Sequence, residues 1–419
     1  MSIHLFSTLF VSLFVLKVVV KLGLDLLNLN HLRKYAGNVP AELQGLIDPE
    51  LLLKNDSYHS ARMAFRITSS LVDSLLIALF LFTPIYANYT NWVERWAAPF
   101  IFKGIGFFLI IEMIGWLIQL PFSYYYHFHL EAAYGFNKYR LGGWLIDSLK
   151  SLAVSVILTS LVLAVIFGIW GNSFSFNWRD ILIGWGLALV LITVFVYLVP
   201  VLLIPFFYKL QPLSDEKLES RIKSMMERAG FKVHGIFVAD ESKKSSHANA
   251  QMAGFGNKKS IILFDTLVNH YEENEILGVV AHEIGHGKKR HILKLSALII
   301  LQAFVFILFA AYLLGTDLPY RFADIPNVFY SGLFITYFFF FDLLGFFIVP
   351  LFGLISRRFE YQADAFSKGI LGSGAPLIKT FEKFITRELD NINPHPIFEA
   401  FYYSHPSLRK RIRALKNGS

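Results

Sequence analysis

The sequence predicts an all-α, polytopic membrane protein with seven transmembrane helices and one small α+β domain at a membrane surface. Of its 419 residues, 55% are hydrophobic and only 17% are charged, whereas soluble domains carry about 25% charged residues. Seven apolar segments are long enough to span a bilayer. A sizeable polar insertion, just before the sixth segment, combines a helical pattern with short strand-like runs. These observations indicate a membrane protein that carries a folded domain outside the bilayer.

The predicted spans alternate with connections of different charge. They cover about residues 3–24, 67–86, 100–122, 151–170, 181–207, 295–315 and 328–355. Lysine and arginine are frequent after spans one, three, five and seven, whereas Arg95, Arg179 and Arg321 are nearly alone in the other connections. Positive charge favours the cytoplasmic side. We therefore expect the N-terminus outside and the C-terminus inside.

The spans divide the chain into four regions. We expect spans one to five with short connections at 1–207, a soluble insertion at 208–294, spans six and seven at 295–355, and a cytoplasmic C-terminal segment at 356–419.

The soluble insertion is predicted to begin with a helix and to continue as a small sheet. Ser214 is the expected N-cap of the helix, and Gly230 marks its end. Strand-like runs follow at Gly235–Ala239, Ala248–Ala253 and Ser260–Phe264. Such a sheet has an open edge, to which an extended peptide can add by main-chain hydrogen bonds.

Ionisable residues inside the predicted spans need polar surroundings. Asp73, Glu112 and Asp342 would each cost several kcal/mol of free energy if they faced lipid. They are therefore expected to face the bundle interior, either lining a water-filled space or pairing between helices. Lys17 and Lys21 lie near the cytoplasmic end of span one, where their amines are expected to reach the membrane surface.

The composition also excludes some kinds of site. The chain contains no cysteine, so disulfides and thiolate ligands are excluded, and any zinc ion must be held by His, Asp or Glu. The net charge of +8 comes from basic clusters between the spans. It therefore requires no nucleic-acid partner, and the expected partner is the lipid bilayer.

The stretch His282-Glu283-Ile284-Gly285-His286 contains the His-Glu-x-x-His pattern of zinc peptidases. Residues four apart on a helix share a face, so His282 and His286 can point at one metal ion. Glu283 lies beside that face, where it can take a proton from an attacking water and return it to the leaving amine. The alternative is a pair of solvated or core histidines on an ordinary helix.

A zinc peptidase needs a third protein ligand and one open coordination position. Glu360 is the leading candidate, because span seven returns the chain to the side on which His282 and His286 lie. Asp364 follows one helical turn later and can hold a ligand in place. Taken alone, an acid here is more often a solvated group near a helix start. The topology and the His-Glu-x-x-His pattern together favour the ligand.

Several separated motifs give the chain a family resemblance. Besides His282–His286, they are Glu131–Asn137, Ser245–Ala250, Ile261–Leu267, Arg357–Asp364 and Ser404–Pro406. With these motifs in this order, the chain resembles the Ste24-type CAAX prenyl endopeptidases of the M48 family, which are integral-membrane zinc metallopeptidases. The resemblance covers nearly the whole chain. It implies seven spans around a water-filled chamber, with a gluzincin-like zinc-peptidase domain on the cytoplasmic side.

The resemblance also implies roles for residues at the metal. It implies one zinc ion per chain, bound by His282, His286 and Glu360, with Glu283 as the general base. His291 lies off the metal-facing stripe of the helix, and a structural role is expected for it.

Other residues are implied around the substrate. Asn249 and Ala250 would hold the substrate strand, and His405 would steady the tetrahedral intermediate. Asp364 and Arg411 would buttress the helix that carries the third ligand. For His247, a hydrogen-bonding role within its loop and a substrate contact remain equal alternatives.

Together, the residues and the resemblance predict a membrane zinc endopeptidase. Its substrate would be a peptide or protein cut near the C-terminus, with an isoprenoid on its cysteine if the family substrate carries over. A quality-control endopeptidase without a prenyl requirement is the near alternative, and a transporter or channel with a structural zinc is the distant one. Short connections and a lean tail favour a bacterial inner membrane over the endoplasmic reticulum, with the active site facing the cytoplasm.

Overall fold

Seven long helices dominate the structure, as the sequence predicts. The computed structural model describes the chain except for residues 41–42, 44, 46–47, 172–176, 255 and 418–419. Within the described residues, seven helical stretches are long and apolar enough to cross a membrane. They contain α1 (Ile3–Lys34), α2 (Pro49–Phe82), α4 (Phe100–Tyr125) with the π-helical η2 (Tyr126–Glu131), α5 (Leu141–Trp170), α6 (Trp178–Thr193) with η3 (Val194–Leu198), α11 (His291–Leu314), and the continuous run of α13 (Phe329–Tyr337), η5 (Phe338–Leu344) and α14 (Gly345–Leu371).

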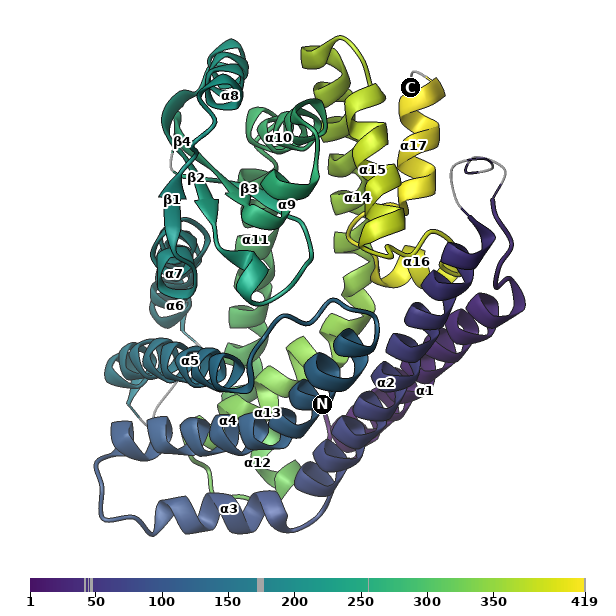
Figure 1. Ribbon diagram of the computed structural model, residues 1–419. Coiled ribbons are helices and arrows are strands. Elements are labelled where there is room, and N and C mark those ends of the chain that lie inside the picture. The colour runs from purple at the N-terminus through teal and green to yellow at the C-terminus, as the bar shows by residue number, and fades with distance from the viewer. Residues whose placement is uncertain (41–42, 44, 46–47, 172–176, 255, 418–419) are drawn as a thin grey trace.

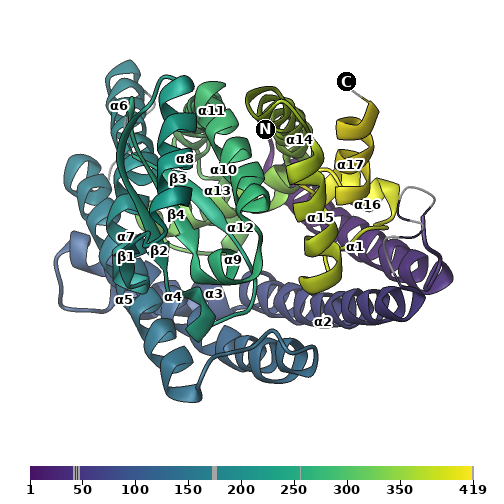
Figure 2. The ribbon, with the colours of Figure 1, turned by 45° about the horizontal axis from the view of Figure 1, so that its top comes forward.

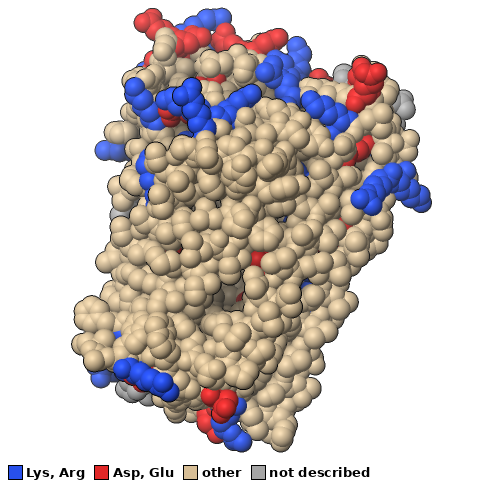
Figure 3. Space-filling view, turned by 60° about the horizontal axis from the view of Figure 1, so that its bottom comes forward, with Lys and Arg blue, Asp and Glu red and all other residues tan. Residues whose placement is uncertain are grey.

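Several of these helices extend well beyond the predicted spans. α2 begins at Pro49, where the carboxylate of the N-cap Asp48 accepts a hydrogen bond from the Glu50 amide at 3.0 Å. Charged side chains gather at the two ends of the molecule, and an almost uncharged band lies between them (Figure 3). Because the helix ends leave this apolar band, hydropathy alone ends the spans too early.

The end of the bundle opposite the sheet is closed by aromatic packing. Two short helices, α3 (Ile85–Glu94) and α12 (Leu318–Ala323), lie there (Figure 1). Phe6, Phe10 and Phe107 are fully buried, and the ring centres of Phe10 and Phe322 lie 4.3 Å apart. Aromatic rings bury much apolar area each, so this cluster holds the helices together at that end.

The insertion between the fifth and sixth spans folds as the small α+β domain that the sequence predicts. After α7 (Val199–Phe207), its elements are β1 (Leu210–Pro212), α8 (Glu216–Arg228), β2 (Lys232–Ala239), η4 (Glu241–Lys243), β3 (Ala250–Ala253), β4 (Lys258–Phe264), α9 (Asp265–His270) and α10 (Glu273–Lys288). The predicted N-cap, Ser214, is wrong by one residue. The carboxylate of Asp215 instead accepts a hydrogen bond from the Leu218 amide at 2.9 Å. Ser and Asp cap helices about equally well, so the sequence does not separate these neighbours.

The strands form one sheet with the order β1-β2-β4-β3. β2 and β4 pair in parallel, and β3 pairs antiparallel with β4, placing Ala250 opposite Leu263. β3 is therefore an edge strand, as expected for a site of peptide addition. It lies against α10, since a Cβ atom on Gly287 would meet the side chain of Met252.

The C-terminal part packs on α10. α14 continues beyond the apolar band to Leu371 and is followed by α15 (Ala375–Arg387), α16 (Pro396–Tyr402) and α17 (Leu408–Asn417). Figures 1 and 2 show α14 and α15 beside α10. α17 lies against α14 and α15. Glu360 and Asp364 thus lie on the helix that also forms the end of the seventh span, without an intervening loop.

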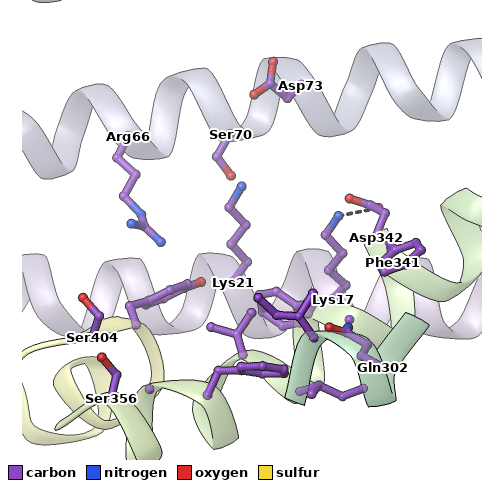
Figure 4. Close-up of a pocket in the computed structure, with 18 of the residues that line it drawn as sticks. Lys17, Lys21, Arg66, Ser70, Asp73, Gln302, Phe341, Asp342, Ser356 and Ser404 are labelled. Atoms are coloured by element: carbon purple, nitrogen blue, oxygen red, sulfur yellow. Dashed lines mark hydrogen bonds and ion pairs between the residues drawn. The ribbon is translucent and has the colours of Figure 1, made fainter. Parts of the chain in front are cut away.

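A cavity of about 930 Å³ lies between α1, α2, α11, η5 and α14. Apolar side chains of α11 and α14 form much of its wall, but charged side chains also face it (Figure 4), namely Lys17, Lys21, Arg66, Asp73 and Asp342. Charged groups within spans occur mainly where they line such a cavity. The cavity corresponds to the chamber that the family resemblance implies.

Lys17 and Lys21 both line this cavity, and Lys17 Nζ donates a hydrogen bond to Asp342 Oδ2 at 2.5 Å. The pairing partner lies on η5, far along the chain, and could not be seen from the local sequence. The reach of their amines to the membrane surface stays a prediction.

Two of the three acids within the spans match the expected situations, and Glu112 matches neither among the described residues. Asp73 and Asp342 line the cavity, and Asp73 Oδ1 also accepts a hydrogen bond from the Gln119 amide at 3.0 Å. Glu112 is not among the lining residues, and its Oε1 is buried without a hydrogen-bond partner in the described part of the chain. Asp73 and Asp342 thus both line the cavity and pair with a residue of another helix.

Candidate metal centre

The helix that carries the two histidines is fixed at its start and along one side. α10 follows a capping box, in which the Glu272 amide donates a hydrogen bond to the Glu275 carboxylate at 2.7 Å. Val280, Ala281 and Ile284 are fully buried. Burial of this apolar side fixes the rotation of α10 about its axis.

His282, His286 and Glu360 converge on one point. The Nε2 atoms of the two histidines lie 3.0 Å apart. Glu360 approaches both, with Oε2 at 3.4 Å from Nε2 of His282 and Oε1 at 3.2 Å from Nε2 of His286. Among the residues that the structure describes, these three side chains form the group that could hold a metal ion.

The separations within this group fit a zinc ion. Zinc binds nitrogen and oxygen at about 2.0–2.1 Å in a tetrahedron, which places neighbouring ligand atoms about 3.3 Å apart. The observed separations of 3.0, 3.2 and 3.4 Å lie close to that value. Three protein ligands leave the fourth position free, as in catalytic rather than structural zinc sites.

Gly285 sets the distance between the two helices that supply the ligands. A Cβ atom here would lie 3.0 Å from Cα of Ala363 and 3.1 Å from its carbonyl oxygen, closer than normal contacts. Gly278, two turns earlier, approaches the backbone of Leu377 in the same way. Because neither glycine has a side chain, α14 and α15 pass close to α10. Glu360 is thereby brought within reach of the histidines.

A buried charged cluster holds His282. Its Nδ1 lies 2.8 Å from Oδ1 of Asp364, and Arg411 donates two hydrogen bonds to the same carboxylate. With Nδ1 facing a carboxylate, Nε2 keeps its lone pair for a metal. Burial disfavours a charge on His282, but hydrogen bonds to Asp364 and Glu360 outweigh burial and raise its pKa to about 9. The two carboxylates thus favour positive charge at this position, and a metal ion would bind Nε2 only in place of a proton.

His286 is oriented by a second set of contacts. Its Nδ1 lies 3.0 Å from Nδ1 of His291, whose Nε2 lies 3.1 Å from the side-chain oxygen of Gln362. The His291 ring also stacks on Phe359, with ring centres 4.2 Å apart. His291 therefore supports a neighbouring side chain, as expected. Gln362 and Phe359 were missed, although their positions on either side of Glu360 in the chain could have indicated them.

The metal group opens onto a groove of about 470 Å³. Glu283, Asn249 and Ala250 line the groove together with His282 and Glu360. Burial raises the pKa of Glu283, which moves this carboxyl towards the range in which a general base works at neutral pH. A peptide lying along β3 would meet Glu283 and the metal group at the same place.

His405 reaches the metal group from the segment between α16 and α17. Its Nε2 lies 3.3 Å from Oε1 of Glu360, and its Nδ1 lies 2.8 Å from the Ser404 hydroxyl. Partial desolvation at the groove wall lowers the pKa of His405, although 61% of its side chain is exposed. A neutral ring with one N–H donor is therefore favoured next to the metal group.

The predicted site residues all lie at or next to this groove. Those that line it are Asn249, Ala250, His282, Glu283, Glu360, His405 and Arg411. His286 contacts Glu360, and Asp364 contacts His282 and Arg411. Residues that are far apart in the sequence thus come together around a single point.

Two family descriptions match the chain and together span almost all of it. Residues 28–209 match the description "CAAX prenyl protease N-terminal, five membrane helices", and residues 212–419 match "Peptidase family M48". CAAX prenyl protease 1 of Saccharomyces cerevisiae is 32% identical, over 90% of this chain and 88% of its own length. The chain belongs to peptidase family M48.

This M48 chain is similar to further relatives over nearly its whole length. The CAAX prenyl protease 1 homolog of Arabidopsis thaliana is 32% identical, over 94% of this chain and 93% of its own. The crystal structure of S. mikatae Ste24p matches with a TM-score of 0.89 at 27% identity, covering 98% of this chain and 99% of that one. The resemblance seen in the sequence is confirmed. The M48 chain is a membrane metalloprotease of the Ste24 type, and its metal cofactor follows from the family.

Proposed function

We propose that this M48 metalloprotease is a zinc endopeptidase that cuts prenylated CAAX-type proteins near their C-termini. The observation that carries the proposal is the group of His282, His286 and Glu360, whose ligand atoms lie at zinc-like separations beside a groove. The groove and the apolar-walled chamber share Tyr402 and Ser404. A peptide in the groove can therefore place an attached isoprenoid in the chamber. The names of the relatives support this substrate class.

The ligand set proposed for zinc is supported by the chemistry of its surroundings. His282, His286 and Glu360 would hold the ion, and Asp364 with Arg411 would keep the His282 ring in place. Zinc, when bound, supplies Lewis acidity that lowers the pKa of water and polarises a carbonyl group. His and carboxylate ligands without thiolates suit this role.

The remaining steps are assigned to residues of the groove. The peptide lies extended beside β3, held at Asn249 and Ala250 by main-chain hydrogen bonds. Glu283 takes the proton from the attacking water and passes it to the leaving amine. His405, neutral in the groove, donates its N–H to the oxygen on which negative charge develops.

We infer that the groove faces the cytoplasm. The domain with α10 and the C-terminal helices emerges at the end of the spans that is reached by the odd-numbered, lysine- and arginine-rich connections. The positive-inside rule assigns that end to the cytoplasm. The preference for a bacterial inner membrane over the endoplasmic reticulum stays a prediction.

The decisive experiment is cleavage of matched peptides by the purified protein. A farnesylated CAAX peptide and its unmodified version are incubated with and without a chelator, and the products are mapped by mass spectrometry. We expect cleavage of the farnesylated peptide that stops with chelator and returns with added zinc. Equal rates for both peptides would favour a quality-control endopeptidase. Solute flux in proteoliposomes that survives chelation, without cleavage, would favour a transporter.

A variant of the third ligand tests the metal assignment separately. Glu360→Ala is expected to lose zinc, because two histidines alone bind it weakly. Metal content is measured in the purified variant by mass spectrometry of the element. Retention of one zinc per chain would require a different third ligand.

A further inference from the structure

A second, polar pocket of about 540 Å³ adjoins the groove. The two spaces share Ala248, Phe384 and Asp390 in their walls. Ala248 precedes Asn249 and β3, so a peptide that follows the edge strand past its first residue enters this pocket. The chamber meets the groove elsewhere, at Tyr402 and Ser404. The groove therefore lies between one largely apolar space and one polar space.

Arg62, on α2, lines the polar pocket and, among the described residues, contacts aromatic rings instead of hydrogen-bond acceptors. Its guanidinium carbon lies 5.3 Å from the ring centre of Tyr58 and 6.0 Å from that of Tyr126. Within the described part of the chain, no oxygen accepts a hydrogen bond from Arg62 and no carboxylate forms an ion pair with it. Arg66, one turn later, instead binds Asp25 at 3.0 Å. Arg62 thus keeps its N–H donors for a ligand.

Two acids of the polar pocket, Glu131 and Glu388, are already engaged, whereas Oε2 of Glu241, which also lines the pocket, has no hydrogen-bond partner in the described part of the chain. Glu131 and Glu388 lie 3.3 and 2.8 Å from the two ring nitrogens of His247, and each also accepts a hydrogen bond from a tyrosine. Burial disfavours a charge on His247, but its bonds to these two acids outweigh burial and raise its pKa to about 9. Asp390 lines the same pocket at an exposed position, and its Oδ1 accepts a hydrogen bond from the Asn391 amide at 2.8 Å. Glu131 and Asp390 lie near enough to Arg62 to attract it electrostatically, but in the described part of the chain neither forms a hydrogen bond or ion pair with it.

We propose that Arg62 binds the free C-terminal carboxylate of the peptide substrate in this pocket. The inference rests on the proposed function, because it takes the occupant of the groove to be a peptide.

A carboxylate suits Arg62, because its two oxygens match the planar guanidinium, which can donate two parallel hydrogen bonds. Among the carboxylates of a peptide, the C-terminal one is present whatever the sequence. Capture of the chain end therefore fixes the cut at a set number of residues from the terminus without reading the sequence. The chamber then takes an apolar group attached on the other side of the cut.

The test compares two versions of one farnesylated peptide, one with a free C-terminal acid and one with a C-terminal amide. The wild-type protein is expected to favour the acid about 10- to 100-fold in kcat/KM, the range for a hydrogen-bonded contact between charged groups. Arg62→Gln should bring the acid-to-amide ratio close to one, and Arg62→Lys should restore part of it. Lys54→Gln, which removes an exposed cation on the same helix, should keep the wild-type ratio.

A binding measurement separates this inference from the proposed function. Binding of the acid and amide peptides is measured with Glu283→Gln protein, with and without Arg62→Gln, so that no turnover is needed. An acid preference that disappears with Arg62→Gln supports the carboxylate site, even where no peptide is cut. Equal binding of acid and amide, or a preference that survives Arg62→Gln, overturns it. Absence of cleavage alone counts against the proposed function only.

Discussion

Arg411 holds Asp364 in a buried, two-pronged ion pair. Nε lies 2.8 Å from Oδ2, and Nη2 lies 2.6 Å from Oδ1. Both residues are almost fully buried, with exposed fractions of 6% and 2%. Because Asp364 also faces Nδ1 of His282, a residue on the last helix controls the orientation of a histidine on α10. The C-terminal helix is therefore part of the metal centre, although it supplies no ligand.

Replacing Arg411 with alanine is expected to weaken metal binding about 10- to 100-fold, the usual effect of losing a group that orients a ligand. The variant also leaves Asp364 and Glu360 buried beside one another without the cation. Zinc affinity is measured by competition with a chelator of known affinity. Arg413→Ala, at an exposed position of the same helix, is the control. Equal zinc affinity in both variants would show that Arg411 does not support metal binding through Asp364 and His282.

Replacing Glu283 with glutamine is expected to leave zinc bound while slowing peptide hydrolysis. The amide cannot accept the proton, so kcat should fall by about 10²- to 10⁴-fold. Zinc content and kcat are measured on the same preparation. Glu273→Gln is a matched control, because Glu273 lies in the first turn of the same helix and bonds to Lys217 and Arg221 at the surface. Full activity of Glu283→Gln would refute the assignment of the base.

Gly285→Ala tests whether close helix contact sets the ligand geometry. The new methyl group would press on the backbone of Ala363, which cannot yield as a flexible side chain would. α14 must then move by a few tenths of an ångström, which displaces Glu360 relative to the histidines. We expect a large loss of kcat/KM together with weaker zinc binding. Gly369→Ala on α14, where a Cβ atom meets nothing within 4 Å, should behave as wild type.

The sequence predicts the fold and the residues at the metal better than the contacts that support them. Long apolar segments and the His-Glu-x-x-His spacing are local patterns, so the seven helices and His282 could be found directly. Glu360 needed topology and family resemblance, because it lies far along the chain. Gln362 and Phe359 were missed, since their role depends on how α14 is rotated against α10.

Two further features could not be found in the sequence for the same reason. Lys17 lines the cavity and pairs with Asp342 on η5, which lies far along the chain. Arg62 gave no signal in the sequence, because its distinctive feature is that, among the described residues, no acid of its pocket forms a hydrogen bond or ion pair with it. Both features depend on which helices pack together. A local stretch of the sequence therefore does not show them.

The pKa of His247 predicts how stability depends on pH. Burial lowers the pKa of His247, but its bonds to Glu131 and Glu388 outweigh burial and raise the pKa to about 9. In the unfolded chain, a histidine has a pKa of about 6.5. The folded state therefore holds this proton more tightly. The resulting stabilisation is full below about pH 6.5 and is lost as the pH rises through about 9. Because 40% of the side chain is exposed, solvent screening reduces the effect.

The measurement compares the melting temperatures of wild type and His247→Gln at several pH values. The variant has a neutral side chain, so it should melt below the wild type at neutral pH. The difference should shrink as the pH passes 9, because the wild type then loses its charge as well. Other groups that titrate in this range affect both proteins alike and cancel in the difference. A gap that stays constant from neutral to alkaline pH would show that the charge on His247 does not stabilise the polar pocket.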